Sequence, residues 1–99
     1  MDLAEVTQRV QAGLASGGFD KTVKFDFGSI GKLFIDGPSK AATNEDKNAD
    51  ATVVVDFEDF KNIAQGKMDP MMAFMSGKLK VLGDMAVAMK LQTLFAQLR

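Results

Sequence analysis

The chain has 99 residues, of which 46% are hydrophobic and 25% charged, and its formal net charge is −1. This composition is typical of one globular domain over residues 1–99, and the near-zero charge gives no electrostatic reason to expect nucleic-acid binding. The absence of cysteine and histidine excludes disulfides, thiolate zinc sites, cysteine nucleophiles and histidine-based catalytic triads.

The first third of the chain predicts a helix followed by a β-hairpin. Asp2 can cap a helix that ends at the glycine pair of residues 17–18, and apolar residues recur along it at helical spacing. From residue 21 onward, apolar and charged residues alternate with the period of a strand. A turn over residues 28–31 leads to a second apolar segment at residues 33–35, which completes the hairpin.

Two further strands are predicted before the middle of the chain. Residues 40–43 can form a short third strand, and the β-branched segment 51–55 is typical of a well-buried strand. A polar loop at residues 44–48 separates the two. The resulting sheet is expected to be largely antiparallel, and one of its faces needs a cover of helices.

Two short helices are predicted to follow this sheet. Asp56 can cap the first helix, with Asp59 three residues later as an acidic form of the capping box, and Gly66 ends it. Asp69 can cap the second helix, because a proline follows it at the first helical position. Gly77 ends that helix.

A strand and a last helix complete the predicted elements. Lysines and apolar residues alternate at 78–81, and Asp84 can cap a helix that runs to about residue 99. This helix has two apolar strips, although covering a sheet requires only one. The first strip comprises Val87, Leu91, Leu94, Phe95 and Leu98. The second comprises Met85, Met89 and Ala96, and it can be a wider core face, a dimer contact or the wall of an internal apolar space.

Methionine is concentrated in one segment. Six of the seven methionines lie between residues 68 and 89, four of them within eight positions. Methionine is unbranched and polarizable, so it can fill irregular space and repack around different ligands, although it also fills gaps in ordinary cores. We expect Met71, Met72, Phe74 and Met75 to face an internal apolar space.

A long segment carries an ordered series of short motifs. Residues 49–91 read ADATVVVDFEDFKNIAQGKMDPMMAFMSGKLKVLGDMAVAMKL. The series comprises an aspartate that opens the buried strand, Asp-Phe at the next helix, Gly-Lys-Met-Asp-Pro, Ala-Phe-Met, Gly-Lys-Leu-Lys-Val, Gly-Asp and Ala-Met-Lys-Leu. In these motifs the chain resembles the sterol carrier protein type 2 family, in a free-standing single-domain form. The preceding helix and hairpin match the family in order and length.

The resemblance implies both a fold and a function. The fold is α+β, with a five-stranded, mostly antiparallel sheet covered on one face by helices that enclose a hydrophobic lipid cavity. The function is binding and intracellular transfer of fatty acid, fatty acyl-CoA, phospholipid or sterol, without catalysis and without a cofactor. The candidate lipid-binding residues are Phe57, Phe60, Ile63, Met71, Met72, Phe74, Met75, Leu79, Val81, Met85, Ala88, Met89 and Phe95.

Two other classes of function stay open. The chain can be a structural or dimerisation module of the same fold, with an apolar strip of the last helix buried in the dimer and no transfer activity. An enzyme would have to use a carboxylate or lysine such as Asp69 or Asp84, and both are already needed as helix caps. We expect no catalytic residue, no metal site, and a monomer or weak dimer.

The lysines of the C-terminal half offer a further interpretation. Residues 57–99 carry a net charge of +2, whereas residues 1–56 carry −3. Most charged faces are simply solvated, but these lysines can also contact anionic lipid headgroups in a transient membrane contact. They are Lys61, Lys67, Lys78, Lys80 and Lys90.

The two ends of the sequence bear on localisation. The N-terminal segment is acidic and periodic, unlike a secretory signal, and the longest apolar runs are too short to span a bilayer. The chain ends Ala-Gln-Leu-Arg and lacks the Ser-Lys-Leu type of peroxisomal address. We therefore expect a soluble, cytoplasmic protein.

Overall fold

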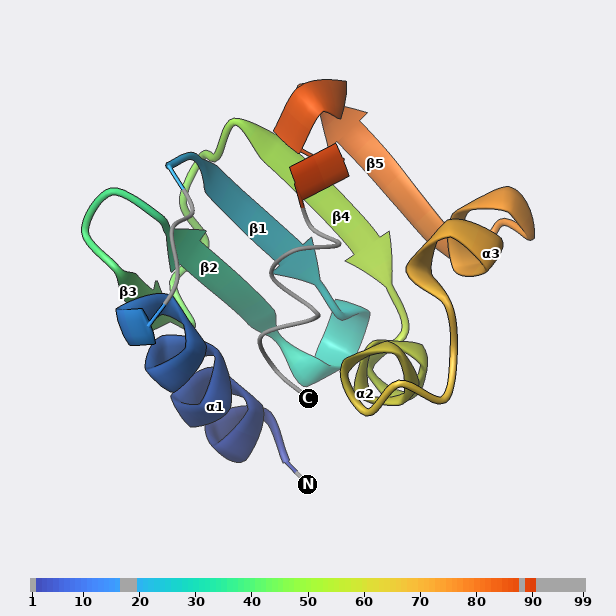
Figure 1. Cartoon of the computed structure of the whole chain (residues 1–99), viewed down its shortest axis with the longest axis horizontal. Coiled ribbons are helices and arrows are strands. Elements are labelled where there is room, and N and C mark those ends of the chain that lie inside the picture. The colour runs from blue at the N-terminus through green and yellow to red at the C-terminus, as the bar shows by residue number, and fades with distance from the viewer. Residues whose placement is uncertain (1, 17–19, 88, 91–99) are drawn as a thin grey trace.

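The computed structural model describes residues 2–16, 20–87 and 89–90 (Figure 1). The helices and strands follow one another along the chain in the predicted order. The elements are α1 (Leu3–Ser16), β1 (Thr22–Asp26), the short 3-10 turn η1 (Gly28–Ile30), β2 (Lys32–Asp36), β3 (Ala41–Thr43), β4 (Ala51–Val55), α2 (Phe57–Ala64), α3 (Pro70–Met75) and β5 (Leu79–Gly83). Residues 85–87 are helical, as expected for the start of the last helix, while its predicted continuation over 91–99 lies outside the described residues.

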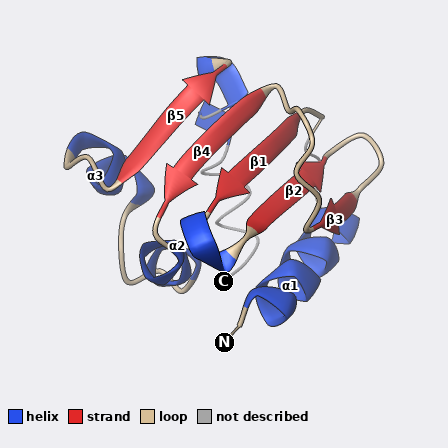
Figure 2. Cartoon of the chain, turned by 180° about the vertical axis from the view of Figure 1, so that it is seen from behind, coloured by secondary structure: helices blue, strands red, loops and turns tan. Residues whose placement is uncertain are grey.

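The five strands form one mixed sheet in the order β3-β2-β1-β4-β5. Neighbouring strands are antiparallel except β1 and β4, which pair in parallel and bring Phe25 opposite Val53. The predicted α+β class and mostly antiparallel sheet are therefore confirmed. Figures 1 and 2 show α1 beside β3, α2 near the ends of β1 and β4, and α3 beside the edge strand β5.

The core lies on the helical side of the sheet. Alternate residues of each long strand point to this side, as the period of two requires, and α1 and α2 add one buried stripe each. No polar or charged side chain among the described residues is buried. The buried cluster comprises Val6, Val10, Leu14, Val23, Phe25, Phe27, Leu33, Ile35, Ala51, Val53, Val55, Phe60, Ile63, Ala73, Leu79 and Val87.

Three of the four predicted aspartate caps are confirmed. The carboxylates of Asp2, Asp69 and Asp84 each accept a hydrogen bond of 2.8–2.9 Å from a backbone N–H in the first turn of the following helix. Asp56 occupies the predicted N-cap position, but its side chain makes no capping hydrogen bond. Only its backbone carbonyl takes part, accepting from the Phe60 N–H at 2.9 Å. The carboxylate of Asp56 therefore stays in solvent.

Asp50 links three strands at one end of the sheet. Its carboxylate accepts hydrogen bonds from the Thr22 N–H at 3.0 Å and the Thr22 hydroxyl at 3.1 Å, and its own N–H donates to that hydroxyl at 2.8 Å. The Thr22 N–H and hydroxyl hold the pKa of Asp50 below its ordinary value. The backbone carbonyl of Asp50 accepts a hydrogen bond from the Asp84 N–H at 2.9 Å. Asp84 directly follows Gly83, the residue of β5 that pairs with Ala51 of β4.

We expect Gly83→Ala to destabilise the protein by about 2–4 kcal/mol, because it combines backbone strain with a clash. Gly83 has φ +98°, and a Cβ there would lie 2.6 Å from the Asp50 carbonyl oxygen. Gly77→Ala is the matched control, since Gly77 has φ +80° and open space around it. Urea unfolding measures both losses. Equal losses in the two variants would show that the clash with the Asp50 carbonyl adds nothing to the destabilisation.

Candidate functional site

The helix α3 is short and sharply bounded. Asp69 caps it, Pro70 occupies its first turn, and the chain leaves it through Gly77, whose φ of +80° is readily adopted only by glycine. Ala73 is the residue of α3 that is buried, where its small side chain lets the helix pack against β5. The larger side chains of α3 therefore project away from the core.

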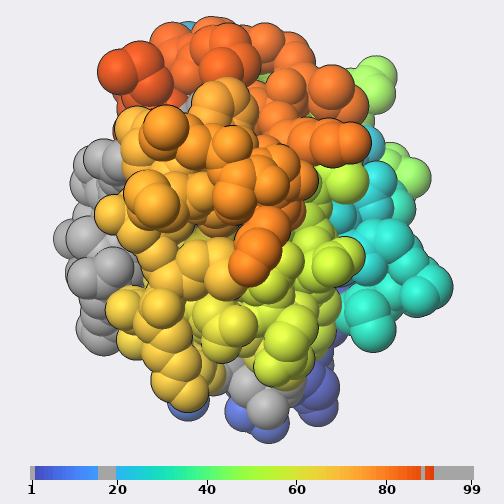
Figure 3. All heavy atoms as spheres, turned by 90° about the vertical axis from the view of Figure 1, so that its right-hand side faces the viewer, coloured from blue at the N-terminus to red at the C-terminus, as the bar shows by residue number. Residues whose placement is uncertain are grey.

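Large hydrophobic side chains are exposed along α3, β5 and the residues that follow β5. Figure 3 shows the side of the molecule on which α3 and β5 lie. Seven of the nine exposed large hydrophobic side chains among the described residues lie between residues 71 and 89. Exposed large apolar side chains that gather in one part of a protein can mark an interaction or ligand-binding site. We call these seven the methionine surface: Met71, Met72, Phe74, Met75, Leu82, Met85 and Met89.

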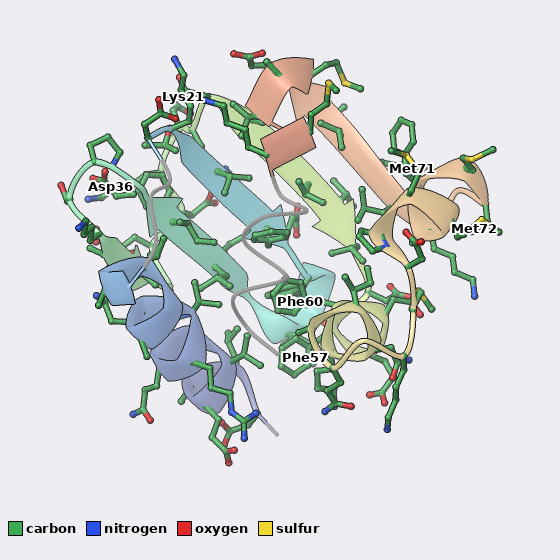
Figure 4. All side chains as sticks on the ribbon, viewed as in Figure 1. Lys21, Asp36, Phe57, Phe60, Met71 and Met72 are labelled. Atoms are coloured by element: carbon green, nitrogen blue, oxygen red, sulfur yellow. The ribbon has the colours of Figure 1, made fainter. Side chains whose placement is uncertain are left out.

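The large side chains of α3 are exposed, whereas the sequence predicted that they face an internal apolar space. Met71 is 49% exposed, Met72 63%, Phe74 41% and Met75 75%. Figure 4 shows Met71 and Met72 on α3 at the outer edge of the molecule, away from the side chains that fill the core. A six-residue helix beside an edge strand buries only one face, and in α3 the buried residue on that face is Ala73. Contact of these four residues with lipid stays a prediction.

Behind this edge, α2 adds an aromatic cluster to the core. The ring of Phe60 makes edge contacts with Phe25 and Phe27, at centroid distances of 4.9 and 5.1 Å. Phe57 makes a similar contact with Phe27 at 5.1 Å, and Figure 4 shows Phe57 and Phe60 close together beside α2. Such geometry is favourable for aromatic rings and fixes α2 against β1.

The remaining candidate lipid-binding residues divide into buried and exposed groups. Phe60, Ile63 and Leu79 are buried, and Phe57 and Val81 are partly buried against the same cluster. Met85 and Met89 are exposed and continue the methionine surface. Ala88 and Phe95 lie outside the described residues. The structure thus brings five candidates together in the core and six on the surface.

The five lysines considered for headgroup contact fall into two groups. Lys61 forms an ion pair with Glu58 at 2.9 Å, and Lys90 forms one with Asp20 at 2.9 Å. The hydrogen bond from each lysine, reinforced by its charge, lowers the pKa of its partner carboxylate. Lys67, Lys78 and Lys80 make no ion pair with any residue that the structure describes. Lys78 and Lys80 nevertheless line a groove that three carboxylates share.

An open groove of about 510 Å³ lies where β1, β4 and the start of β5 approach the first turn of α2. Its charged lining consists of Asp26, Asp56, Asp59, Lys78 and Lys80. The backbone N–H of Gly28 and the Lys32 ammonium, each 2.9 Å from Asp26, lower the pKa of that carboxylate. Sequence patterns did not predict this groove, because its walls come from three separate segments, 26–28, 54–59 and 77–80. Charges of both signs favour water over an acyl chain here.

Membership of a protein family follows from a comparison with known families. The model of the SCP-2 sterol transfer family matches residues 3–96, so the chain belongs to that family. This confirms the resemblance drawn from residues 49–91.

Individual relatives agree with this assignment. Hydroxysteroid dehydrogenase-like protein 2 from Xenopus laevis is 40% identical over 93 residues, which are 94% of this chain and 20% of that protein. Sterol carrier protein 2 from Homo sapiens is 46% identical over 61 residues, which are 62% of this chain and 11% of that protein. The chain therefore spans only about a tenth to a fifth of the length of these relatives.

A solved structure shows the same fold. Sterol Carrier Protein-2 from Aedes aegypti, determined by solution NMR in complex with the C16 fatty acid palmitate, superposes with a TM-score of 0.82. The two sequences are 21% identical, and the superposition covers 100% of both chains. The two proteins therefore share the same fold.

Three further observations concern metal ligands, membrane spans and the two capping carboxylates in the described part of the chain. It holds no cluster of three or more acidic side chains that could bind a metal ion. None of its helices has the length and hydropathy needed to cross a bilayer. The carboxylates of Asp69 and Asp84, the candidates for enzyme chemistry, are both used as helix caps.

Proposed function

We propose that this protein binds hydrophobic lipids and transfers them within the cytoplasm, without catalysing a reaction. The ligand classes are fatty acid, fatty acyl-CoA, phospholipid and sterol. The observation that carries the proposal is the family match over residues 3–96. The palmitate bound by the mosquito relative of the same fold supports an acyl chain as the first ligand to test.

The methionine surface supports this function through its chemistry. Methionine side chains repack at little cost, so one wall of methionines can accept lipids of different shape. A sixteen-carbon chain offers on the order of 10 kcal/mol through burial of its methylene groups, before the costs of immobilising it. Micromolar binding therefore needs no dedicated polar site.

The thirteen candidate residues form a lipid path in this proposal. The exposed side chains of α3 and of residues 85 and 89 receive the lipid at the edge of β5. Phe60, Ile63 and Leu79 form the inner wall that the acyl chain reaches as α3 moves from its present position. The proposal thus assigns the outer residues to entry and the inner residues to retention.

Native mass spectrometry of the protein, purified without detergent, tests this function. We expect discrete adducts at lipid masses, and organic extraction of the same sample identifies the lipid released. The physical reason is that an empty apolar cavity large enough for a lipid would cost several kcal/mol. A mass without adducts, together with failure to take up added fatty acid or acyl-CoA, would refute the proposal.

A structural or dimerisation module of the same fold is the second candidate. The exposure of Met85 and Met89 favours it, because a partner subunit could cover these side chains. Analytical ultracentrifugation separates the two candidates when combined with lipid extraction. A dimer that hides Met85 and Met89 and carries no lipid would support the module.

A further inference from the structure

The exposed apolar side chains of the methionine surface are mostly sulfur-containing. Five of its seven members are methionines, and their side chains are between 49% and 77% exposed. Elsewhere in the described chain the exposed large hydrophobic side chains are Ile30 and Val54, which contain no sulfur. We call the five the exposed methionines: Met71, Met72, Met75, Met85 and Met89.

The rest of the sequence offers an oxidant little else to attack. The chain contains no cysteine, tryptophan, tyrosine or histidine, and its aromatic residues are all phenylalanine. Cysteine and methionine are the side chains whose sulfur reacts with mild oxidants. Because this chain has no thiol, a peroxide reacts first with methionine sulfur.

Burial divides the methionines of this segment into two groups. Met68 is partly buried and packs against the core cluster. Figure 4 shows Met71 and Met72 at the outer edge of the molecule, and Met75 lies one helical turn after Met71, on the same face of α3. A peroxide in solvent therefore reaches the sulfur atoms of α3 more freely than that of Met68.

The oxidation of methionine by hydrogen peroxide is a balanced two-electron step. A sulfur lone pair attacks one peroxide oxygen, so that an S–O bond forms and the O–O bond breaks. The sulfur loses two electrons, and the second oxygen leaves as water with both hydrogen atoms. Methionine sulfoxide reductases reverse the step with a dithiol, which becomes a disulfide while the sulfoxide oxygen leaves as water. Each epimer of the sulfoxide has its own reductase.

A sulfoxide changes this surface without entering the core. The modified side chain is polar and accepts hydrogen bonds, and on an exposed residue it stays hydrated. The core cluster of the described residues contains none of the exposed methionines. A bound acyl chain, by contrast, would have to remove water from each sulfoxide oxygen without supplying a donor in its place. Oxidation should therefore weaken lipid binding and leave the fold intact.

We propose that the exposed methionines form a reversible oxidation site that controls lipid binding. Hydrogen peroxide converts them to sulfoxides and lowers the affinity for an acyl chain, and reduction restores it. This site deepens the proposed carrier function, on which its effect on lipid rests. The order in which the methionines react rests on their exposure alone.

Peptide mass spectrometry after graded treatment with hydrogen peroxide tests the site. Trypsin releases residues 68–78 and 81–90, which together hold all six methionines of the segment, and fragmentation assigns each added oxygen atom. Met75 and Met89 should react fastest and Met68 slowest in the folded protein. In urea the six rates should become similar. Oxidation of Met68 as fast as that of Met75 in the folded protein would overturn the proposal.

Titration with a fluorescent fatty acid tests the effect on binding. Treatment that oxidises the exposed methionines but not Met68 should lower the affinity at least about 10-fold, with an unchanged circular dichroism spectrum. Incubation with both sulfoxide reductases and dithiothreitol should restore both the mass and the affinity. An unchanged affinity after oxidation, or a restored mass without restored affinity, would overturn the control of lipid binding.

Replacement by leucine provides matched variants. In one variant all five exposed methionines are leucine, which is apolar but contains no sulfur. Whatever its starting affinity, peroxide should leave that affinity unchanged. The control Met68→Leu should stay as sensitive to peroxide as the wild type. An equal loss in the fivefold variant would show that oxidation acts elsewhere and would overturn the proposal.

The two proposals can fail separately. A protein that carries lipid with the same affinity before and after oxidation would refute the oxidation site as a control and leave the carrier function standing. A protein that carries no lipid, before treatment or after reduction, would refute the carrier function and with it the effect on lipid. The oxidation map would still decide whether the exposed methionines are the site of modification.

Discussion

Replacing Phe60 by alanine is expected to lower the free energy of unfolding by about 3–5 kcal/mol. The side chain is only 1% exposed and makes edge contacts with the rings of Phe25 and Phe27. Its removal leaves a cavity at the point where α2 packs on β1, and β1 is the central strand of the sheet. Because a small domain has about 5–15 kcal/mol of stability in total, this loss is a large part of it.

Phe74→Ala is the matched control for this prediction. It removes the same side chain from α3, where Phe74 is 41% exposed, and should cost less than about 1 kcal/mol. Urea denaturation measures both variants, and an unchanged slope with denaturant shows that the same transition is compared. Similar losses in the two variants would mean that Phe74 is buried in solution and that the methionine surface is covered.

The sequence predicted the elements and their buried faces well, because both depend on local patterns. The stripe of α1 and the alternation along β1 each place apolar residues on one side, whatever element lies opposite. The caps at Asp2, Asp69 and Asp84 are equally local, since each involves a side chain and a backbone N–H two or three residues away. Such contacts form within one turn of chain.

Contacts between distant segments were harder to predict. The parallel pairing of β1 with β4 depends on how the chain crosses the sheet after β3, and the residues of either strand do not specify it. Asp56 has the sequence context of a cap, yet its carboxylate makes no hydrogen bond to the helix that it precedes. The groove beside Asp56 was not predicted because three segments distant in the sequence contribute to its walls.

The outer part of the candidate site shows where sequence reasoning stops. The spacing of Met71, Met72 and Met75 identifies apolar residues on a short helix, but not whether that helix faces a cavity or solvent. A buried wall and an exposed entry surface have the same composition. Ala73, the small residue between them, turned out to determine which side of α3 meets β5.

The double variant Met71→Lys/Met75→Lys is expected to lose at least about 100-fold in affinity for fatty acid while the fold is retained. Met71 is 49% exposed and Met75 75%, so lysines there should change stability by about 0.5 kcal/mol or less. An ammonium against a bound acyl chain must give up water without gaining a partner, which costs several kcal/mol. Titration with a fluorescent fatty acid measures the affinity, and circular dichroism checks the fold.

The control for this variant adds the same charge at another exposed site. Ser29→Lys/Ile30→Lys places two lysines in η1, where Ile30 is 54% exposed and lies outside the methionine surface. If both variants lose affinity equally, the effect is one of net charge and α3 has no special role in lipid binding. If neither loses affinity, a bound acyl chain does not contact α3, and the lipid must be held by the inner residues Phe60, Ile63 and Leu79 alone. A loss confined to the α3 variant would place the bound acyl chain against α3, as the carrier proposal requires, because only contact with the lipid distinguishes this site from η1.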